Sequence, residues 1–311
     1  MMKGFLKDNT PGMQFLFTLL VVVASWLIFQ LIALAGGVLI YDIPFKEIPG
    51  IVLNPSTPRE IAFLKFLQTI ISLGLFAVSS AIAAYFISER PAAFLGLSHA
   101  PDAGIFLLVG LLVLLSLPLN NYLTFLNSRL SFHGGMQWLQ DYIVDKESSI
   151  NDLMERFLSV NGIGPLMINL VVIAVVPAIS EELLFRGVLQ KLFVKWVNNV
   201  HFGIFITALV FGFFHFQFLS FLPRFYLGII FGYLLVWTGS LWITMFAHFI
   251  NNATAVLFYY FYYQGVTDDS IDQVGTPGSH FAYALLSLAV VAVLLMVVRR
   301  IMKEKQAFSQ Y

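Results

Sequence analysis

Eight apolar stretches, most of them long enough to cross a bilayer as a helix, constrain the fold of this chain more than any other feature. A transmembrane helix needs about 20 apolar residues, and hydrophobic types make up 59% of the 311 residues. Charged residues make up only 11%, against about 25% in soluble domains. The expected spans are roughly Met13–Ile40, Ile61–Ile87, Ala103–Leu126, Ile163–Phe193, Phe202–Phe221, Phe225–Trp237, Leu241–Tyr262 and Phe281–Ile301. We therefore predict an all-α polytopic membrane protein with about eight transmembrane helices, forming one integral-membrane domain over residues 1–311.

The fourth stretch is too long for one straight span and carries charges in its middle. It fits either a span followed by an amphipathic half-helix or one long tilted helix. If the fifth span begins at Phe202 on one face of the membrane, His215 lies about 20 Å deep at 1.5 Å per residue. Glu181 must then reach an equal depth, so we favour the long tilted helix.

Composition excludes several classes of protein. The chain has no cysteine, which excludes a disulfide framework, a thiol nucleophile and a Cys-ligated zinc site. Its net charge is zero, so nothing indicates a nucleic-acid partner. The apolar stretch that follows Lys3 and Lys7 is too long for a signal-peptide core, and we interpret it as an uncleaved span.

Basic residues predict the orientation of the chain, because they favour the cytoplasmic side. The two ends carry Lys3, Lys7, Arg299, Arg300, Lys303 and Lys305, whereas the loop before the last span carries Asp268, Asp269 and Asp272. We expect both termini to be cytoplasmic. The long loop Ser128–Asn161 then faces outward, and its alternating apolar residues predict an amphipathic helix at the membrane surface.

The first polar cluster in the apolar background is Glu181, Glu182 and Arg186. On a helix, Glu182 and Arg186 lie on one face and are expected to form an ion pair. Glu181 is rotated by about 100° from Glu182 and is free for another role, because neighbouring acids in different environments can do different work. The alternative is an interfacial helix start with Ser180 as N-cap.

Two further clusters follow, each in a different apolar stretch. His215 stands alone among phenylalanines, and His248 is followed by Asn251 and Asn252. His248 and Asn252 share a helix face and suit the stabilisation of an oxyanion. The alternative for both histidines is ordinary hydrogen bonding to a neighbour or between helices.

Taken together, the three clusters predict one intramembrane catalytic cavity, with a core at about residues 163–262. In one chemistry, Glu181 and His215 activate a water while His248 and Asn252 stabilise the oxyanion. In the other, a carboxylate and two histidines hold Zn²⁺ with an open position for water. The sequence leaves both open, so the cofactor is none or zinc.

The order and spacing of Glu-Glu-x-x-x-Arg (Glu181–Arg186), Phe-x-x-x-His (Phe211–His215) and His-x-x-x-Asn (His248–Asn252) resemble the CPBP family. These are intramembrane CAAX prenyl endopeptidases of the Ras-converting type and bacterial relatives linked to bacteriocin processing and immunity, also called Abi proteins. The resemblance implies an eight-helix membrane endopeptidase, described as glutamate-type or metalloprotease, whose cavity opens toward the cytoplasm. It implies catalytic roles for Glu181, His215, His248 and Asn252, and supporting roles for Glu182 and Arg186.

The leading functional hypothesis is therefore hydrolysis of membrane-associated or lipid-anchored peptides in a bacterial inner membrane. The partners expected are a peptide or protein substrate in or at the membrane and the lipid bilayer. A non-catalytic immunity or scaffold protein that binds a peptide in the same cavity is the alternative. A proton-relaying transporter is disfavoured because the two halves of the chain show no matching repeats.

Overall fold

The computed structural model describes residues 2–130, 134–267, 273–277 and 280–308, and these residues form helices and loops without strands. Seven helices in the described part are long and apolar enough to cross a membrane. They span Pro11–Tyr41, Pro58–Ile87, Ala103–Ser128, Ile163–Val197, Phe218–Thr238, Leu241–Tyr263 and Phe281–Lys305. The prediction of an all-α polytopic membrane protein is confirmed. The fifth apolar stretch forms a shorter helix of 15 residues, Val200–Phe214, in addition to these seven.

Several spans consist of more than one helical segment. The main segments are α1 (Pro11–Tyr41), α3 (Pro58–Ser72), α4 (Ser79–Ile87), α6 (Ala103–Leu115), α7 (Leu117–Ser128), α9 (Ile163–Asn169), α10 (Val176–Glu182), α11 (Gln190–Val197), α12 (Val200–Phe214), α13 (Phe221–Thr238), α14 (Leu241–Tyr263) and α15 (Phe281–Phe308). Shorter connecting helices are α2 (Ile48–Leu53) and α5 (Pro91–Leu95). The longest helix outside the spans is α8 (Gln137–Leu158).

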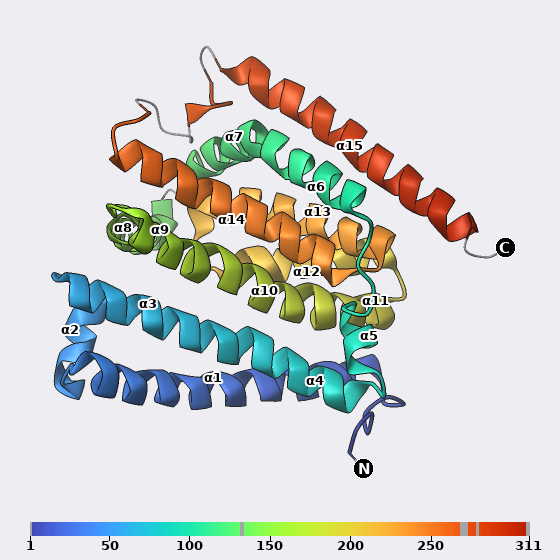
Figure 1. Cartoon of the computed structure of the whole chain (residues 1–311), viewed down its shortest axis with the longest axis horizontal. Coiled ribbons are helices and arrows are strands. Elements are labelled where there is room, and N and C mark those ends of the chain that lie inside the picture. The colour runs from blue at the N-terminus through green and yellow to red at the C-terminus, as the bar shows by residue number, and fades with distance from the viewer. Residues whose placement is uncertain (1, 131–133, 268–272, 278–279, 309–311) are drawn as a thin grey trace.

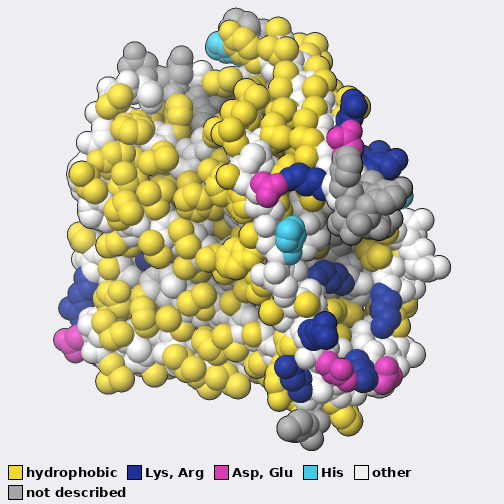
Figure 2. Space-filling model, turned by 45° about the vertical axis from the view of Figure 1, so that its right-hand side comes forward, with side chains coloured by type: hydrophobic (Ala, Val, Ile, Leu, Met, Phe, Trp, Pro, Cys, Tyr) yellow, Lys and Arg dark blue, Asp and Glu magenta, His cyan; other side chains and the backbone are white. Residues whose placement is uncertain are grey.

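The spans lie side by side in three groups (Figure 1). Helix α1 packs against α3 and α4 on one side, while α6, α7 and α15 pack together on the other. Between them lie α10 to α14, with α12 against α13 and α10 against α14. Both termini lie at the same end of the bundle (Figure 1). Hydrophobic side chains cover most of the surface in Figure 2, and Lys and Arg gather near one end, as expected for a bundle surrounded by lipid.

Sequence signals set several helix boundaries. Thr57 begins α3 with a capping box, in which its hydroxyl accepts from the Glu60 amide while the Glu60 carboxylate accepts from the Thr57 amide. Asn199 caps α12 by accepting from the Phe202 amide at 3.0 Å. Gly239 ends α13 in the left-handed conformation (φ 66°) that favours glycine.

The prediction of one long fourth helix is confirmed. The chain is helical from Ile163 to Val197, and Glu181 lies near the middle of this helix. Two π-helical segments, Leu170–Val175 and Leu183–Leu189, flank α10. Such wide turns leave carbonyl groups free for other partners and occur often at functional sites. The interpretation of Ser180 as an N-cap is wrong, because Ser180 lies inside the helix and donates to the Val176 carbonyl.

The prediction that His215 lies inside a span ending at Phe221 is wrong. Helix α12 ends at Phe214 with His215 as its C-cap, and the next helical turn begins at Phe218. The break carries the polar residues His215 and Gln217, but it is only three residues long and apolar stretches adjoin it on both sides, so hydropathy averaged over a window gives no sign of it. The following span is correspondingly longer than the short Phe225–Trp237 predicted from the sequence.

The amphipathic helix predicted between the third and fourth spans is present as α8. Its axis runs across the spans, since α8 is seen nearly end-on at one end of the bundle in Figure 1. Ile143, Glu147 and Phe157 face inward, whereas Trp138 and Tyr142 are exposed. The loop residues Asp268, Asp269 and Asp272, used to predict orientation, lie outside the described residues.

Candidate active site

The polar residues of three separate helices meet inside the bundle. Glu181 and Glu182 come from α10, His215 from the end of α12, and His248 from α14. Glu181 Oε2 lies 3.8 Å from His215 Nε2, and Glu182 Oε1 lies 3.1 Å from His248 Nδ1. The two histidines are linked by Phe211, whose ring centroid is 5.0 Å from that of His215 and 6.0 Å from that of His248. The sequence clusters therefore form two adjacent acid–imidazole pairs.

The pair Glu182–His248 belongs to a buried network that also includes Arg186, although Glu182 Oε2 and Arg186 Nε have no hydrogen-bond partner among the described residues. Glu182 Oε1 accepts from Arg186 Nη1 at 2.8 Å and lies within hydrogen-bond distance of His248 Nδ1. The side chains of Glu182 and Arg186 are fully buried, so the ion pair expected from the four-residue spacing is present in a dry setting. The contact from Glu182 to His248 was not expected from the sequence. It orients the imidazole, since one ring nitrogen is fixed by the carboxylate.

Aromatic rings and a glycine carbonyl complete the surroundings of Arg186. The guanidinium carbon lies 4.4 Å from the ring centroid of Phe211 and 5.4 Å from that of Phe231, geometries that permit cation–π attraction. Arg186 Nη2 also donates to the Gly228 carbonyl at 3.4 Å. A Cβ atom at Gly228 would lie 2.9 Å from that of Ala208. Glycine is needed there because α12 and α13 approach too closely for a side chain.

The second pair, Glu181 and His215, is open by comparison. Its side chains retain 13% and 26% of their surface exposed. His215 Nδ1 lies 2.8 Å from the Phe211 carbonyl. A carbonyl can only accept, so Nδ1 carries the proton, and the neutral ring presents its lone pair on Nε2 toward Glu181. Glu181 Oε2 has no hydrogen-bond partner among the described residues, and 3.8 Å is too long for a direct bond and suits a bridging solvent molecule.

The spacing of the Phe-x-x-x-His motif has a direct structural reason. His215 follows Phe211 by four positions, about one helical turn, so the imidazole reaches back to the Phe211 carbonyl at the end of α12. The same phenylalanine supplies its ring to Arg186 and both histidines. One residue thus fixes the histidine tautomer through its backbone and covers the ion pair through its side chain.

Asn252 lies one helical turn beyond His248 on α14. Its Nδ2 donates to the Ile173 carbonyl at 3.1 Å, and its Oδ1 accepts from Asn251 Nδ2 at 3.0 Å. Ile173 lies in the first π-helical segment of the long helix. Asn252 is therefore oriented by the same helix that carries Glu181, and its Nδ2 atom makes no second hydrogen bond to a described residue.

The zinc alternative needs three protein ligands around one ion. No three His, Asp or Glu side chains in the described part of the chain are arranged to hold a metal. His248 Nδ1 and Glu182 are engaged with each other and with Arg186. These donors do not fit a zinc site, and the chemistry derived below uses protein side chains and water.

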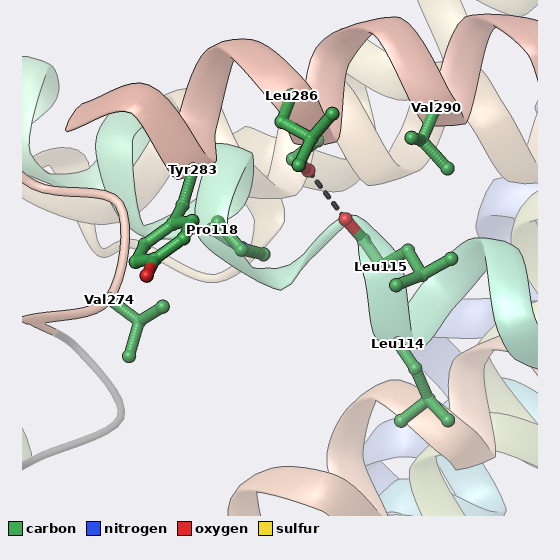
Figure 3. Close-up of a pocket in the computed structure, with 8 residues that line it drawn as sticks. Leu114, Leu115, Pro118, Val274, Tyr283, Leu286 and Val290 are labelled. Atoms are coloured by element: carbon green, nitrogen blue, oxygen red, sulfur yellow. Dashed lines mark hydrogen bonds between the residues drawn. The ribbon is translucent and has the colours of Figure 1, made fainter. Parts of the chain in front are cut away.

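A separate apolar cavity of about 330 Å³ lies between α6, α7 and α15 (Figure 3). Leu114, Pro118, Leu286 and Val290 line it, and Ser287 Oγ donates to the Leu115 carbonyl beside it. None of the polar residues described above lines this cavity. It has no acid–base pair and is not a candidate for the catalytic site.

The fold and the polar clusters define an all-α integral membrane protein with paired carboxylates and imidazoles between its helices. Residues 163–254 match the family model described as type II CAAX prenyl endopeptidase Rce1-like. This match confirms the family resemblance inferred from the three motifs, all of which lie inside it.

Among curated proteins, the uncharacterized protein YpbD of Bacillus subtilis (strain 168) is 30% identical to this chain over 122 residues. The alignment covers 38% of this chain and 56% of the relative, so the chain matches little more than half of that protein's length. No solved structure matches the chain.

Proposed function

We propose that this protein is an intramembrane endopeptidase in which Glu181 and His215 activate a water molecule. The observation that carries the proposal is the geometry of this pair. An unpartnered carboxylate oxygen and an imidazole lone pair face each other 3.8 Å apart between buried helices. The match of residues 163–254 to the endopeptidase family model supports it independently.

In the proposed reaction, water between the two side chains attacks the carbonyl carbon of a peptide bond. One proton of the water passes to the Glu181–His215 pair as the new C–O bond forms. The same proton is then delivered to the amide nitrogen as the C–N bond breaks, which yields a carboxylic acid and an amine. Arg186 forms an ion pair with Glu182, so Glu181 is the carboxylate available for this proton transfer.

His248 and Asn252 are proposed to stabilise the negative charge that develops on the carbonyl oxygen. The Glu182 carboxylate can only accept, so His248 Nδ1 donates to it, and Nε2 is the nitrogen proposed to donate to the oxyanion, which it does in the doubly protonated form of the ring. Asn252 retains one amide proton beyond its bond to the Ile173 carbonyl. Both side chains are held in place before substrate arrives, as an oxyanion site requires.

The proposed substrate is a membrane-associated or lipid-anchored peptide, because the reacting groups lie between membrane helices. The family description names a prenylated CAAX terminus, which makes a prenylated peptide the first substrate to try. We also propose that the end carrying both termini is cytoplasmic and that the protein resides in a bacterial cell membrane, because its spans are apolar and the curated relative comes from a bacterium.

Reconstitution into lipid vesicles tests the proposal. Internally quenched peptides with a farnesylated, an acylated or no lipid anchor would be added to wild-type protein and to the His215→Ala variant. We expect the wild type to cleave at least one lipid-anchored peptide and the variant to cleave none while still binding it. Equal cleavage by both proteins, or binding without cleavage by the wild type, would show that the pair is not catalytic; the second result favours the immunity or scaffold alternative.

A further inference from the structure

The break after His215 lies at a depth where exposed backbone is costly. Helix α12 has 15 residues, about 22 Å at 1.5 Å per residue, which is shorter than the hydrocarbon core of about 30 Å. The turn His215–Gln217 and the start of the next helix therefore lie within the bundle. Non-helical backbone at such depth needs protein partners for its amides and carbonyls.

Two buried side chains from outside the family-matched segment supply these partners. Asn127, at the end of α7, donates from Nδ2 to the Phe218 carbonyl at 2.7 Å and accepts at Oδ1 from the Leu222 amide at 2.6 Å. Glu147, on α8, accepts from the Leu219 amide. The two side chains expose only 2% and 6% of their surface.

The backbone of the turn itself is strained. Phe216 has φ 51°, a left-handed conformation that is rare for a bulky residue. Strained residues persist when their surroundings over-determine them, and they cluster at functional sites. The bonds from Asn127 and Glu147 begin two residues after Phe216 and oppose its relaxation.

Arg224 adds a further tie within the same segment. Its guanidinium donates to the Ser220 carbonyl at 3.2 Å and to the Gln217 side chain. One side chain of α13 is thus bonded to the last residue of the turn and to the short helix that follows it.

We propose that Asn127 and Glu147 are positioning residues that hold the turn after His215 and thereby fix the imidazole against Glu181. The inference rests on the proposed function for its catalytic consequence, while the anchoring is testable without any activity. It makes α7 and α8 part of the active-site machinery, although both lie outside residues 163–254.

The decisive variants distinguish the loss of a hydrogen-bond acceptor from the loss of the Glu147 charge. Glu147→Ala removes the acceptor of the Leu219 amide, whereas Glu147→Gln keeps an oxygen at the same place. Asn127→Leu removes both bonds of Asn127, whereas Asn127→Asp keeps the acceptor for Leu222. Asp145→Ala is the matched control, because Asp145 is an exposed acid on the same helix.

Hydrogen–deuterium exchange of the amides of Leu219 and Leu222 measures the anchor in protein reconstituted in nanodiscs. We expect exchange at least tenfold faster in Glu147→Ala and Asn127→Leu, and rates like wild type in Glu147→Gln and Asp145→Ala. Nitrogen-15 histidine spectra measure the consequence: the His215 signal, assigned by its absence in His215→Ala, should move in the first two variants. Unchanged exchange, or faster exchange with an unmoved His215 signal, overturns the proposal.

Activity adds a third readout. With a cleaved peptide in hand, Glu147→Ala should lower kcat about a hundredfold with KM within about twofold, and Glu147→Gln should restore most of the rate. A fall in melting temperature without a change in kcat would mark a purely structural role and overturn the proposal. A wild type that cleaves nothing would refute the proposed function, whereas the exchange and histidine spectra would still decide whether the anchor positions His215.

Discussion

Glu181 and Glu182 are neighbours in the sequence, yet the structure places them in opposite environments. Glu182 is fully buried and shares one oxygen between Arg186 and His248. Glu181 is partly exposed and faces His215 across a gap that is too long for a hydrogen bond. Each acid keeps one oxygen, Oε2, without a hydrogen-bond partner among the described residues. Glu182 is tied through its other oxygen to a cation and an imidazole, whereas Glu181 makes no direct bond to the imidazole that it faces.

This difference separates the roles of the two acids. A buried carboxylate that pairs with an arginine lowers the cost of burying that cation, and the same oxygen of Glu182 holds the imidazole of His248 in place. A carboxylate without a partner destabilises the fold unless something else uses it, as is common at functional sites. The following predictions test whether this division holds, from the largest expected effect to the smallest.

Glu181→Gln should reduce the rate of peptide cleavage about a thousandfold, because an amide cannot take the proton of the attacking water. Glutamine has nearly the same size as glutamate, so the melting temperature of the variant should stay within a few degrees of wild type. Cleavage assays and thermal unfolding in the same detergent measure the two effects. Cleavage at the wild-type rate would show that Glu181 is not the carboxylate that activates water.

Arg186→Met should destabilise the protein by about 3 kcal/mol, because the Glu182 carboxylate then lies buried without its cation. The double variant Glu182→Leu/Arg186→Met is the control. It removes both charges and should recover much of the lost stability, yet stay poorly active because His248 loses its orienting partner. Thermal unfolding that shows equal stability for the single and double variants contradicts the buried ion pair.

Asn252→Leu should lower kcat about a hundredfold, as expected when one donor to an oxyanion is lost. Thr254→Val is the matched control on α14, because Thr254 only donates to the Ile250 carbonyl of its own helix. Comparing kcat and KM for both variants tests the role. If Asn252→Leu changes stability but leaves kcat unchanged, Asn252 serves only to join two helices and is not part of the oxyanion site.

Removal of metal ions should have the smallest effect. No three acids or histidines in the described residues are arranged as ligands, so activity should change less than about twofold after exhaustive chelation. Elemental analysis of the treated protein verifies that zinc is gone. Activity that disappears with the metal and returns with added zinc would establish the alternative chemistry.

Much of the fold was predictable because the bilayer imposes simple rules. Seven of the helices follow from apolar length, and the long fourth helix followed from the need to bring Glu181 to the depth of His215. The end of α12 at Phe214 was not predictable. The two polar residues there, His215 and Gln217, could equally stand in a continuing helix, and Asn127 and Glu147, which bond to the backbone after the break, lie far away in the chain.

The sequence alone determined that this protein is a bundle of membrane helices and which polar groups it carries, because hydrophobic length and the cost of buried charge are local properties. It also determined the pairing of Glu182 with Arg186, since a four-residue spacing places both on one helix face. The sequence also predicted that Glu181 and His215 meet, and the tertiary structure places them 3.8 Å apart. Only the tertiary structure decided that His248 joins Glu182 and that α7 and α8 contact the helical turn that follows His215. Those contacts join helices through atoms separated by 34 to 95 residues, and no local pattern records which distant partner a buried polar group will find.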